Sequence, residues 1–425
     1  MTPESVLALD EIDLSDLAFW ARPWSEREGA FALLRRERPL GLFEEPDLSA
    51  TSPLAPPRGP GYRAVTRHAD VAEISRHPEI YCSGRGAVSI FDLPPEMVEY
   101  FAGMISTDNP RHARLRRIVS AAFNPRRIKA IEENIQAVAD RVIDRAAGLG
   151  ECDFVTEISA PMPLEIICEM MGVPPSEYAT VFHATNVILS GGDTEFIPEG
   201  NDPMMAGLDA GATLTALMKE LAEARVADPT DDLTTALITT NIDGEALTHD
   251  EVASFFILLL TAGNETTRNS ITHALLALTE YPDQRALWQA DPVTIAATGV
   301  DEIVRWASPV IWMRRTVTED TVLSGQELHD GDKVLLFYNS ANRDEDAFED
   351  PFTFDVRRSP NPHFGFGAAG PHFCLGAHLA RREIDVMMRE LLARLPDIEA
   401  SGEPDRLHSS FINGIKHLPC RFTPA

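Results

Sequence analysis

The chain has 425 residues, 44% of them hydrophobic and 24% charged, which is the composition of an ordinary globular protein. Its formal net charge of −29 excludes a general binder of nucleic acids or anionic membranes, because both functions need a basic surface. The five cysteines show no CxxC spacing, the start of the sequence has no apolar leader, and the longest apolar run, FFILLL, is too short to cross a bilayer. We therefore expect a cytoplasmic protein with reduced thiols and no membrane anchor.

Helical patterns dominate the chain in sequence order, and strand-like segments are few. The predicted helices cover residues 69–76, 111–149, 163–171, 248–281 and 375–395. The predicted strands lie at 61–66, around 321–339 and at 411–422. Two long irregular segments, 83–107 and 190–206, separate the helices. No interdomain linker is visible, so we expect one domain over residues 1–425, mainly α with minor β, with residues 1–15 disordered.

One predicted helix has polar residues at its centre. It begins at Thr248, which has capping-box spacing to Glu251, and it ends before Pro282. At ~1.5 Å per residue it is about 48 Å long, enough to run through a large domain. Its centre reads AGNETT, residues 262–267, where a glycine costs about 1 kcal/mol and buried polar groups need partners. A functional site at this midpoint is one interpretation, and polar residues that face solvent are the other.

A single cysteine, Cys374, stands in the glycine-rich segment GPHFCLG, residues 370–376. A buried, inert cysteine is the usual explanation of such a residue. Zinc is disfavoured because the nearby histidines lack a second thiolate at the usual spacing. The other interpretation is a thiolate ligand of haem iron, since glycines allow close approach to a flat macrocycle and a following helix would fix the loop.

The longer segment GFGAAGPHFCLGAHLAR resembles the haem-binding loop of the cytochrome P450 family. Gly370, His372, Cys374 and Gly376 match the family pattern in register, whereas Phe366 lies one residue further from the cysteine than in the commonest form. The resemblance implies that Cys374 is the axial ligand of haem b. Phe366, His372 and Gly376 would contact the same cofactor.

Three further segments resemble motifs of this family in the right order. AGNETT resembles the oxygen-activation motif, which implies that the acid Glu265 and the alcohol Thr266 deliver protons to dioxygen, with Ala262 beside the haem. EIVR provides Glu302 and Arg305, which an ordinary surface pair would also explain.

By the resemblance, Glu302 and Arg305 would form with Arg358 a buried cluster that braces the haem loop. DNPRHARLRR, residues 108–117, resembles the segment that binds the haem propionates. The residues implied for the propionates are His112, Arg116, Arg315 and His372. For residues 108–117 a solvated, basic helix start is the alternative.

The resemblance covers the chain from about residue 15 to its end and implies the P450 fold, with a long central helix over the haem and a small β-sheet region near the N-terminus. It implies a monooxygenase that inserts one oxygen atom of O2 into a C–H bond of an apolar small molecule. The electrons would come from NAD(P)H through a separate ferredoxin and ferredoxin reductase. Residues 111–129 hold seven Lys/Arg and no acid, and we expect Arg117 and Arg127 there to dock an acidic ferredoxin.

The motifs are most similar to an actinobacterial branch that hydroxylates steroids and methyl-branched lipids. Terpenoids and antibiotic intermediates are the alternative substrates. A peroxygenase and a non-catalytic haem sensor or carrier are disfavoured, because the chain keeps both Glu265 and Thr266. The candidate pocket residues, each of which would also suit a plain core position, are Leu258, Ala262, Val310, Ile311, Trp312 and Phe411. We expect a monomer that binds no nucleic acid, with the loops at 83–105 and 190–206 as a mobile lid.

Overall fold

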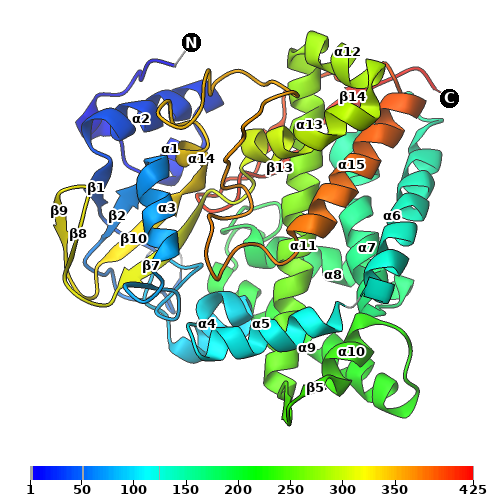
Figure 1. The fold of residues 1–425 in the computed structure, drawn as a ribbon, viewed down its shortest axis with the longest axis horizontal. Coiled ribbons are helices and arrows are strands. Elements are labelled where there is room, and N and C mark those ends of the chain that lie inside the picture. Colours follow the sequence, from blue (N-terminus) through cyan, green and yellow to red (C-terminus); the bar gives the residue numbers. More distant parts are fainter. Residues whose placement is uncertain (1–2, 50–51, 124, 425) are drawn as a thin grey trace.

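The computed structural model describes residues 3–49, 52–123 and 125–424, without the side chains of residues 125–128 and 130. Its elements form two regions, a mixed sheet on one side and a larger set of helices on the other (Figure 1). The prediction of a mainly α fold with minor β is confirmed.

The larger sheet combines N-terminal strands with strands from far along the chain. Its strand order is β1-β2-β10-β7-β3, in which β10 runs parallel to β2 and antiparallel to β7. The strands are β1 (Leu40–Phe43), β2 (Tyr62–Val65), β3 (Tyr81–Cys82), β7 (Trp312–Val317) and β10 (Lys333–Phe337). The expected sheet region near the N-terminus is therefore present, and residues 312–337 complete it.

Helices α2 (Trp24–Glu37) and α3 (His68–Arg76) lie beside this sheet (Figure 1). Ile12 and Leu14, within the stretch expected to be disordered, are buried in the same core cluster as Phe31 of α2. Packing of these apolar side chains gives that part of the N-terminal stretch a fixed place.

The helical region is organised around α11 (His249–Glu280), which runs through the middle of the view in Figure 1. Its capping box is present: the Thr248 side chain accepts from the Glu251 amide, and the Glu251 carboxylate accepts from the Thr248 amide. The helix ends at Glu280, one residue before the predicted end, and Pro282 begins α12. The helices that pack against it include α4 (Pro95–Ala102), α7 (Pro161–Met171), α8 (Tyr178–Leu189), α9 (Pro203–Ala227), α13 (Pro292–Ala307) and α15 (Ala377–Arg394).

Several predicted boundaries differ from the structure. The helix expected over 111–149 is two helices, α5 (Arg111–Ala122) and α6 (Pro125–Ala146). The strand expected to continue through Tyr338 stops at Phe337, where α14 (Tyr338–Ala341) begins. The remaining helices are α1 (Leu17–Trp20), α10 (Leu233–Thr239) and α12 (Pro282–Ala290).

A second sheet joins the C-terminal end of the chain to the segment before α7. Its strand order is β11-β14-β4, formed by Glu399–Ala400, Pro419–Arg421 and Glu151–Asp153. The short strand β13 (Ile415–His417) precedes β14 and pairs with β12 (Asp405–Arg406). Within the part of the chain that the structure describes, no helix combines the length and apolar character needed to cross a membrane.

Candidate functional site

A cavity of about 640 Å³ lies between α11 and the loop that carries Cys374. Its α11 wall includes Leu258, Ala262 and Thr266, and its opposite wall is the loop from Gly365 to Gly376. The volume is within the range of small-molecule and cofactor sites. The central helix and the cysteine loop, which are about 110 residues apart in the sequence, therefore meet at one site.

The loop holds the Cys374 sulfur toward this cavity. The Cys374 amide donates to the Phe366 carbonyl at 3.0 Å, and the Gly376 amide donates to the sulfur. The exposed surface of Cys374 opens into the cavity, while the surrounding protein atoms bury the thiol enough to raise its pKa above the ordinary value. Burial outweighs the Gly376 hydrogen bond and the nearby arginines, so a cation at the sulfur is what would favour the thiolate.

The stretch between Phe366 and the cysteine, which holds one residue more than the commonest form, begins in a tight turn. The Gly367 amide donates to the Phe364 carbonyl at 2.8 Å, and Gly367 has φ of +80°, a conformation that favours glycine. The hydrogen bonds from the Cys374 amide to Phe366 and from Gly376 to the sulfur coexist with this turn.

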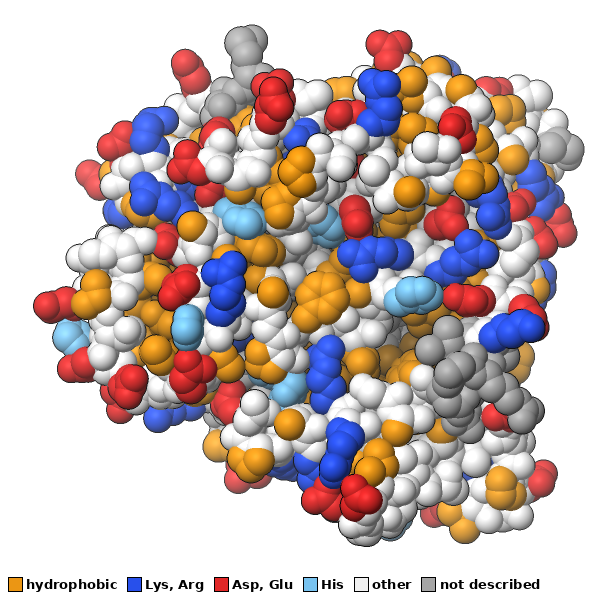
Figure 2. Space-filling view, viewed as in Figure 1, with side chains coloured by type: hydrophobic (Ala, Val, Ile, Leu, Met, Phe, Trp, Pro, Cys, Tyr) orange, Lys and Arg blue, Asp and Glu red, His pale blue; other side chains and the backbone are white. Residues whose placement is uncertain are grey.

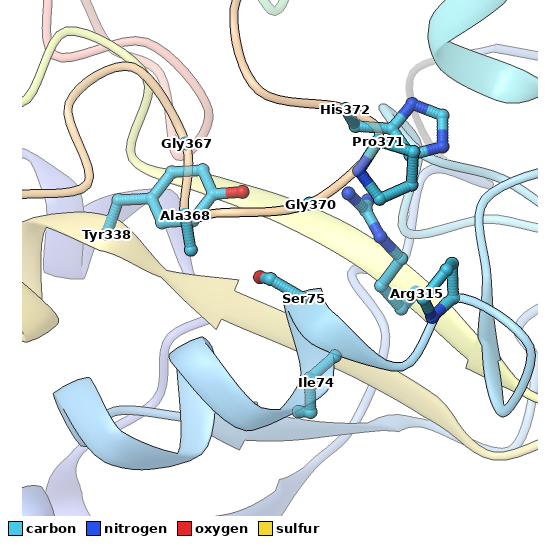
Figure 3. A pocket seen from close by; sticks show the side chains of 10 residues that line it. Ile74, Ser75, Arg315, Tyr338, Gly367, Ala368, Gly370, Pro371 and His372 are labelled. Atoms are coloured by element: carbon cyan, nitrogen blue, oxygen red, sulfur yellow. The ribbon is translucent and has the colours of Figure 1, made fainter. Parts of the chain in front are cut away.

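Residues 367–372 of the cysteine loop pack on the C-terminal end of α3. Figure 3 shows Ser75 beneath Gly370, with Arg315 extending from β7 toward Pro371 and His372. The residues around this point leave a gap of about 10 Å³, which is about the room of one water molecule. A Cβ added to Gly370 would lie 2.3 Å from the Ser75 carbonyl oxygen, so only glycine fits this approach.

Four basic side chains meet at one end of the cavity: His112, Arg116, Arg315 and His372. The rings of His112 and His372 are 4.2 Å apart, and burial with the neighbouring arginines lowers the pKa of His372 to about 2. The pKa of His112 is also lowered by burial. The buried Nε2 of His372 has no hydrogen-bond partner among the described residues. Two guanidinium groups that no described carboxylate pairs with, next to an orphaned histidine nitrogen, fit a cofactor that bears carboxylates.

Arg116 also has a structural contact that the motif does not predict. Its guanidinium donates to the carbonyl oxygens of Pro371 and Phe373, at 2.8 Å each. Arg116 thus fastens α5 to the cysteine loop. Arg315 instead donates to the carbonyl of its own neighbour on β7, Arg314, at 2.7 Å.

The acid and the alcohol of AGNETT point in different directions. Thr266 lines the cavity and donates to the Ala262 carbonyl at 2.8 Å. Glu265 is fully buried on the side toward α8, where its Oε1 accepts from Arg268 and, at 2.8 Å, from Asn269. The interpretation that these polar residues face solvent is wrong for Glu265, which is 1% exposed.

The side of α11 that faces α8 carries several polar atoms without partners. Arg268 continues from Glu265 to the Asn186 amide oxygen of α8 at 2.9 Å. Glu265 Oε2 and both amide atoms of Asn264 are buried without a hydrogen bond among the described residues. Arg268 was missed in the sequence, although its i,i+3 spacing from Glu265 is visible there.

Glu383 on α15 is a second buried acid that sequence reasoning missed. It lines the cavity, and burial raises its pKa to about 8, while a hydrogen bond from Thr267 opposes that rise. The available signal was an acid among the apolar positions of the helix over 375–395.

Glu302, Arg305 and Arg358 lie together beneath the loop. Glu302 accepts from Arg305 at 2.7 and 2.8 Å and from Arg358 at 3.1 Å, and both Glu302 and Arg305 are fully buried. Arg305 also donates to the carbonyls of Asn342 and Pro351. The cluster therefore ties α13 to the segment that leads into the cysteine loop.

The candidate pocket residues divide into two groups. Leu258, Ala262 and Val310 line the cavity. Ile311 and Trp312 are instead buried in the core cluster beside the N-terminal sheet, where the rings of Trp312 and Phe411 are 4.9 Å apart. Phe366 lines the cavity under the Arg381 guanidinium, which lies 4.3 Å from its ring centre.

The basic stretch 111–129 is partly neutralised by acids of the same chain. Arg111 pairs with Glu99, and Arg117 pairs with Glu245. Arg127 lies outside the described side chains. In Figure 2 basic and histidine side chains lie across the middle of the face that carries α15 and the cysteine loop, and acidic ones are frequent at its edges.

A model of the family described as cytochrome P450 matches residues 293–415. The chain is 48% identical to a methyl-branched lipid omega-hydroxylase of Mycobacterium tuberculosis, over 98% of this chain and 96% of that protein. It is 42% identical to a steroid C26-monooxygenase of Mycolicibacterium smegmatis, over 86% of this chain and 84% of that one. A solved cytochrome P450 of Mycobacterium marinum, in complex with pseudoionone, has a TM-score of 0.90 at 42% identity, over 98% of this chain and all of that one.

Proposed function

Since the chain belongs to the cytochrome P450 family and is thus a haem-dependent monooxygenase that uses redox partners, we propose that it hydroxylates the terminal methyl carbon of a methyl-branched lipid. The observation that carries this proposal is the 48% identity to a methyl-branched lipid omega-hydroxylase over nearly the whole of both chains. The apolar cavity wall, with Leu258 and Val310, is consistent with such a substrate. A steroid is the second candidate, favoured by the 42% identity to a steroid C26-monooxygenase.

We propose that Cys374 is the axial ligand and that the four basic residues at the end of the cavity bind the propionates of the haem. Bound haem supplies the redox-active iron at which dioxygen is reduced. The proposal is supported by the sulfur that faces the cavity, the Gly376 amide that donates to it, and the orphaned Nε2 of His372. Ala262, Phe366 and Gly376 would contact the macrocycle because they line the same cavity.

We propose that Thr266 holds a proton at its hydroxyl inside the cavity and that Glu265 supplies protons from the side of α8. The support is that Thr266 lines the cavity while Glu265 lies on the side toward α8, with no hydrogen-bond partner for its Oε2 among the described residues. Hydrogen bonds from Arg268 and Asn269 fix the orientation of the Glu265 carboxylate. A water molecule at Oε2 would then complete the path by which protons pass from Glu265 to Thr266. The apolar residues of the cavity exclude other water from the reacting carbon.

We propose that Glu302, Arg305 and Arg358 position the cysteine loop. Leu258, Ala262 and Val310 are the proposed substrate contacts. The electron donor in this proposal is a ferredoxin reduced by an NAD(P)H-dependent reductase, and the enzyme works in the cytoplasm. The five free cysteines and the net charge of −29 are in keeping with that location.

The substrate proposal is tested with purified enzyme, ferredoxin, reductase and NADPH, offered a methyl-branched fatty acid, cholest-4-en-3-one and a terpenoid. We expect the branched fatty acid to displace water from the iron in a spectral titration and to yield a product hydroxylated at the terminal methyl carbon. Preferential turnover of the steroid or the terpenoid would contradict the proposal.

Thr266→Ala is expected to reduce product formation about 10²-fold, because one proton-transfer group is lost. Thr279→Ala is the matched control, since Thr279 lies on the same helix and donates to the Leu275 carbonyl at 2.8 Å in the same manner. Equal losses in both variants would show that the effect comes from the helix and not from the cavity. Reduction under carbon monoxide is expected to give the red-shifted Soret band of a thiolate ligand, and Cys374→His should abolish it.

A further inference from the structure

Two cysteines outside the cavity face each other across neighbouring strands. Cys152 of β4 and Cys420 of β14 are directly opposite in an antiparallel pair. Both are free thiols, and their sulfur atoms are 3.5 Å apart. A disulfide bond is about 2.05 Å long, so closure requires the sulfurs to approach by roughly 1.5 Å.

The backbone around this pair is fixed in register on both sides. The Phe154 amide donates to the Leu418 carbonyl at 2.8 Å, and the Phe422 amide donates to the Gly150 carbonyl at 2.8 Å. The Leu418 amide also donates to the Asp153 carboxylate at 3.0 Å. Because the strands are already held together, bond formation needs rotation of two side chains and little movement of the chain.

The other cysteines of the chain differ from this pair in surroundings. Cys82 and Cys168 are buried, and burial raises the pKa of each thiol. Cys374 faces the cavity. Cys152 is partly exposed, and a hydrogen bond from the Cys420 thiol lowers its pKa, while the pKa of Cys420 is raised by the same neighbour. Cys152 is therefore the thiol that ionises first and reaches a reagent from solvent.

We propose that Cys152 and Cys420 form a reversible intramolecular disulfide by exchange with a small disulfide such as oxidised glutathione. The Cys152 thiolate attacks one sulfur of the reagent, the reagent's S–S bond breaks, and one reduced glutathione leaves. The Cys420 thiolate then attacks the Cys152 sulfur of the mixed disulfide, and the second glutathione leaves. Two protein thiols lose two protons and two electrons, and the reagent gains both to become two thiols.

The bond would link β14 covalently to β4. The two cysteines are 268 residues apart, so the bond closes a very large loop of the unfolded chain. Five residues before Cys420, on β13, the Ile415 amide donates to the Asn269 side chain at 3.0 Å, and Asn269 donates to Glu265 at 2.8 Å. The disulfide would thus hold in place the segment that orients Asn269. This inference does not rest on the proposed substrate.

The test incubates the haem-loaded protein in a series of glutathione buffers and measures intact mass and peptide maps without reduction. We expect a loss of two hydrogen atoms from the protein in one two-electron transition, a single cross-link between the peptides of Cys152 and Cys420, and full reversal by dithiothreitol. The oxidised protein should melt about 2–5 °C higher than the reduced protein.

Cys152→Ser and Cys420→Ser should each lose the cross-link and the rise in melting temperature, whereas Cys82→Ser should keep both. A stable glutathione adduct on Cys152, a cross-link to another cysteine, or no oxidation in glutathione disulfide alone would each overturn the proposal. Because the mass and peptide maps are read on the unmodified sequence, a variant that fails to fold does not affect the outcome.

Discussion

Replacement of Glu302 by glutamine removes the only carboxylate that the guanidinium groups of Arg305 and Arg358 contact within 4 Å among the described residues. The change keeps the shape of the side chain and deletes its charge. Glu302 and Arg305 have no exposed surface, and Arg358 is 9% exposed, so water does not replace the lost partner. Two cations would remain beside a neutral amide whose NH2 group points at one of them.

The cost follows from the burial. Removing one partner of a buried ion pair destabilises a protein by about 3–5 kcal/mol, a large part of a total stability of about 5–15 kcal/mol. At about 2.1 cal/mol/K per residue, 425 residues have an unfolding entropy of about 0.9 kcal/mol/K. Glu302→Gln should therefore lower the melting temperature by about 3–6 °C. It should also lower the haem content of the purified protein, because the cluster ties α13 to the segment before the cysteine loop.

Asp385→Asn is the matched control for this change. Arg382 and Asp385 have the same i,i+3 spacing and the same 2.7 Å distance, but their side chains are 36% and 25% exposed. An exposed pair contributes at most about 1 kcal/mol, so the control should shift the melting temperature by about 1 °C or less. The assay is scanning calorimetry together with haem quantification. If Glu302→Gln shifts the melting temperature no more than Asp385→Asn does, the charge of Glu302 does not hold this segment.

Three other changes test separate parts of the structure. The pKa of His417 is raised mainly by its hydrogen bond to Asp153, so its contribution to stability is complete below about pH 6.5 and is lost as the pH rises through the higher folded pKa. The difference in melting temperature between wild type and His417→Gln should therefore be largest at pH 6 and shrink by pH 9. A difference that stays constant with pH would contradict this. Glu383 has a pKa of about 8 in the folded protein against 4.5 for the free group, so the wild type loses stability as the pH rises between those values. The melting temperature of Glu383→Gln should therefore rise relative to that of the wild type from pH 5 to pH 8.5. Melting temperatures that change with pH in parallel in the two proteins would show that Glu383 is ionised in the fold. Gly370→Ala should lower the free energy of unfolding by about 1–3 kcal/mol and lower the haem content, since its Cβ would lie 2.3 Å from the Ser75 carbonyl oxygen. Gly148→Ala, whose Cβ would have no described neighbour within 4 Å, should leave the haem content unchanged. Equal haem content in the two variants would argue against the close approach of Gly370 to Ser75.

Much of the secondary structure could be predicted from local signals in the sequence. The capping box of Thr248 and Glu251, together with Pro282, predicted both ends of α11 to within one residue, because capping and the missing amide of proline act within one turn. The end of β10 at Phe337 was missed because apolar residues continue beyond it. The split of residues 111–149 was missed although Pro125, which begins the second helix, is a local signal for it. The five-stranded sheet was only partly predicted, because the pairing of β2 with β10 joins segments about 270 residues apart in the chain.

In the candidate site, too, local motifs could be predicted from the sequence, whereas contacts between distant segments could not. Motif spacing indicated Cys374, Thr266 and the basic residues that meet at the cavity, because each belongs to a segment with its own pattern. Spacing did not indicate that Arg116 donates to carbonyls of the loop, nor that Trp312 packs on Phe411 in a core cluster. Those contacts depend on which segments the fold places side by side, and a single sequence carries no record of that.

Pairs of opposite charge three residues apart illustrate why the fold decides what a motif does. Glu302 with Arg305, Glu265 with Arg268, and Arg382 with Asp385 are equivalent as letters in a helix. The first is completely buried and binds three segments together, and the third is a solvated pair of little energetic value.

The pair of Glu265 and Arg268 is also buried, at 2% and 3% exposed side chain, but one carboxylate oxygen of Glu265 has no hydrogen-bond partner in the part of the chain that the structure describes. A buried carboxylate with both oxygens bound is a structural element, whereas one free oxygen leaves room for a proton to be exchanged. Neutralising Arg268 with Arg268→Gln should therefore affect proton delivery more than haem binding. We expect less product per NADPH consumed at unchanged haem content. If product yield and haem content fell by the same factor, the pair of Arg268 and Glu265 would have only a structural role.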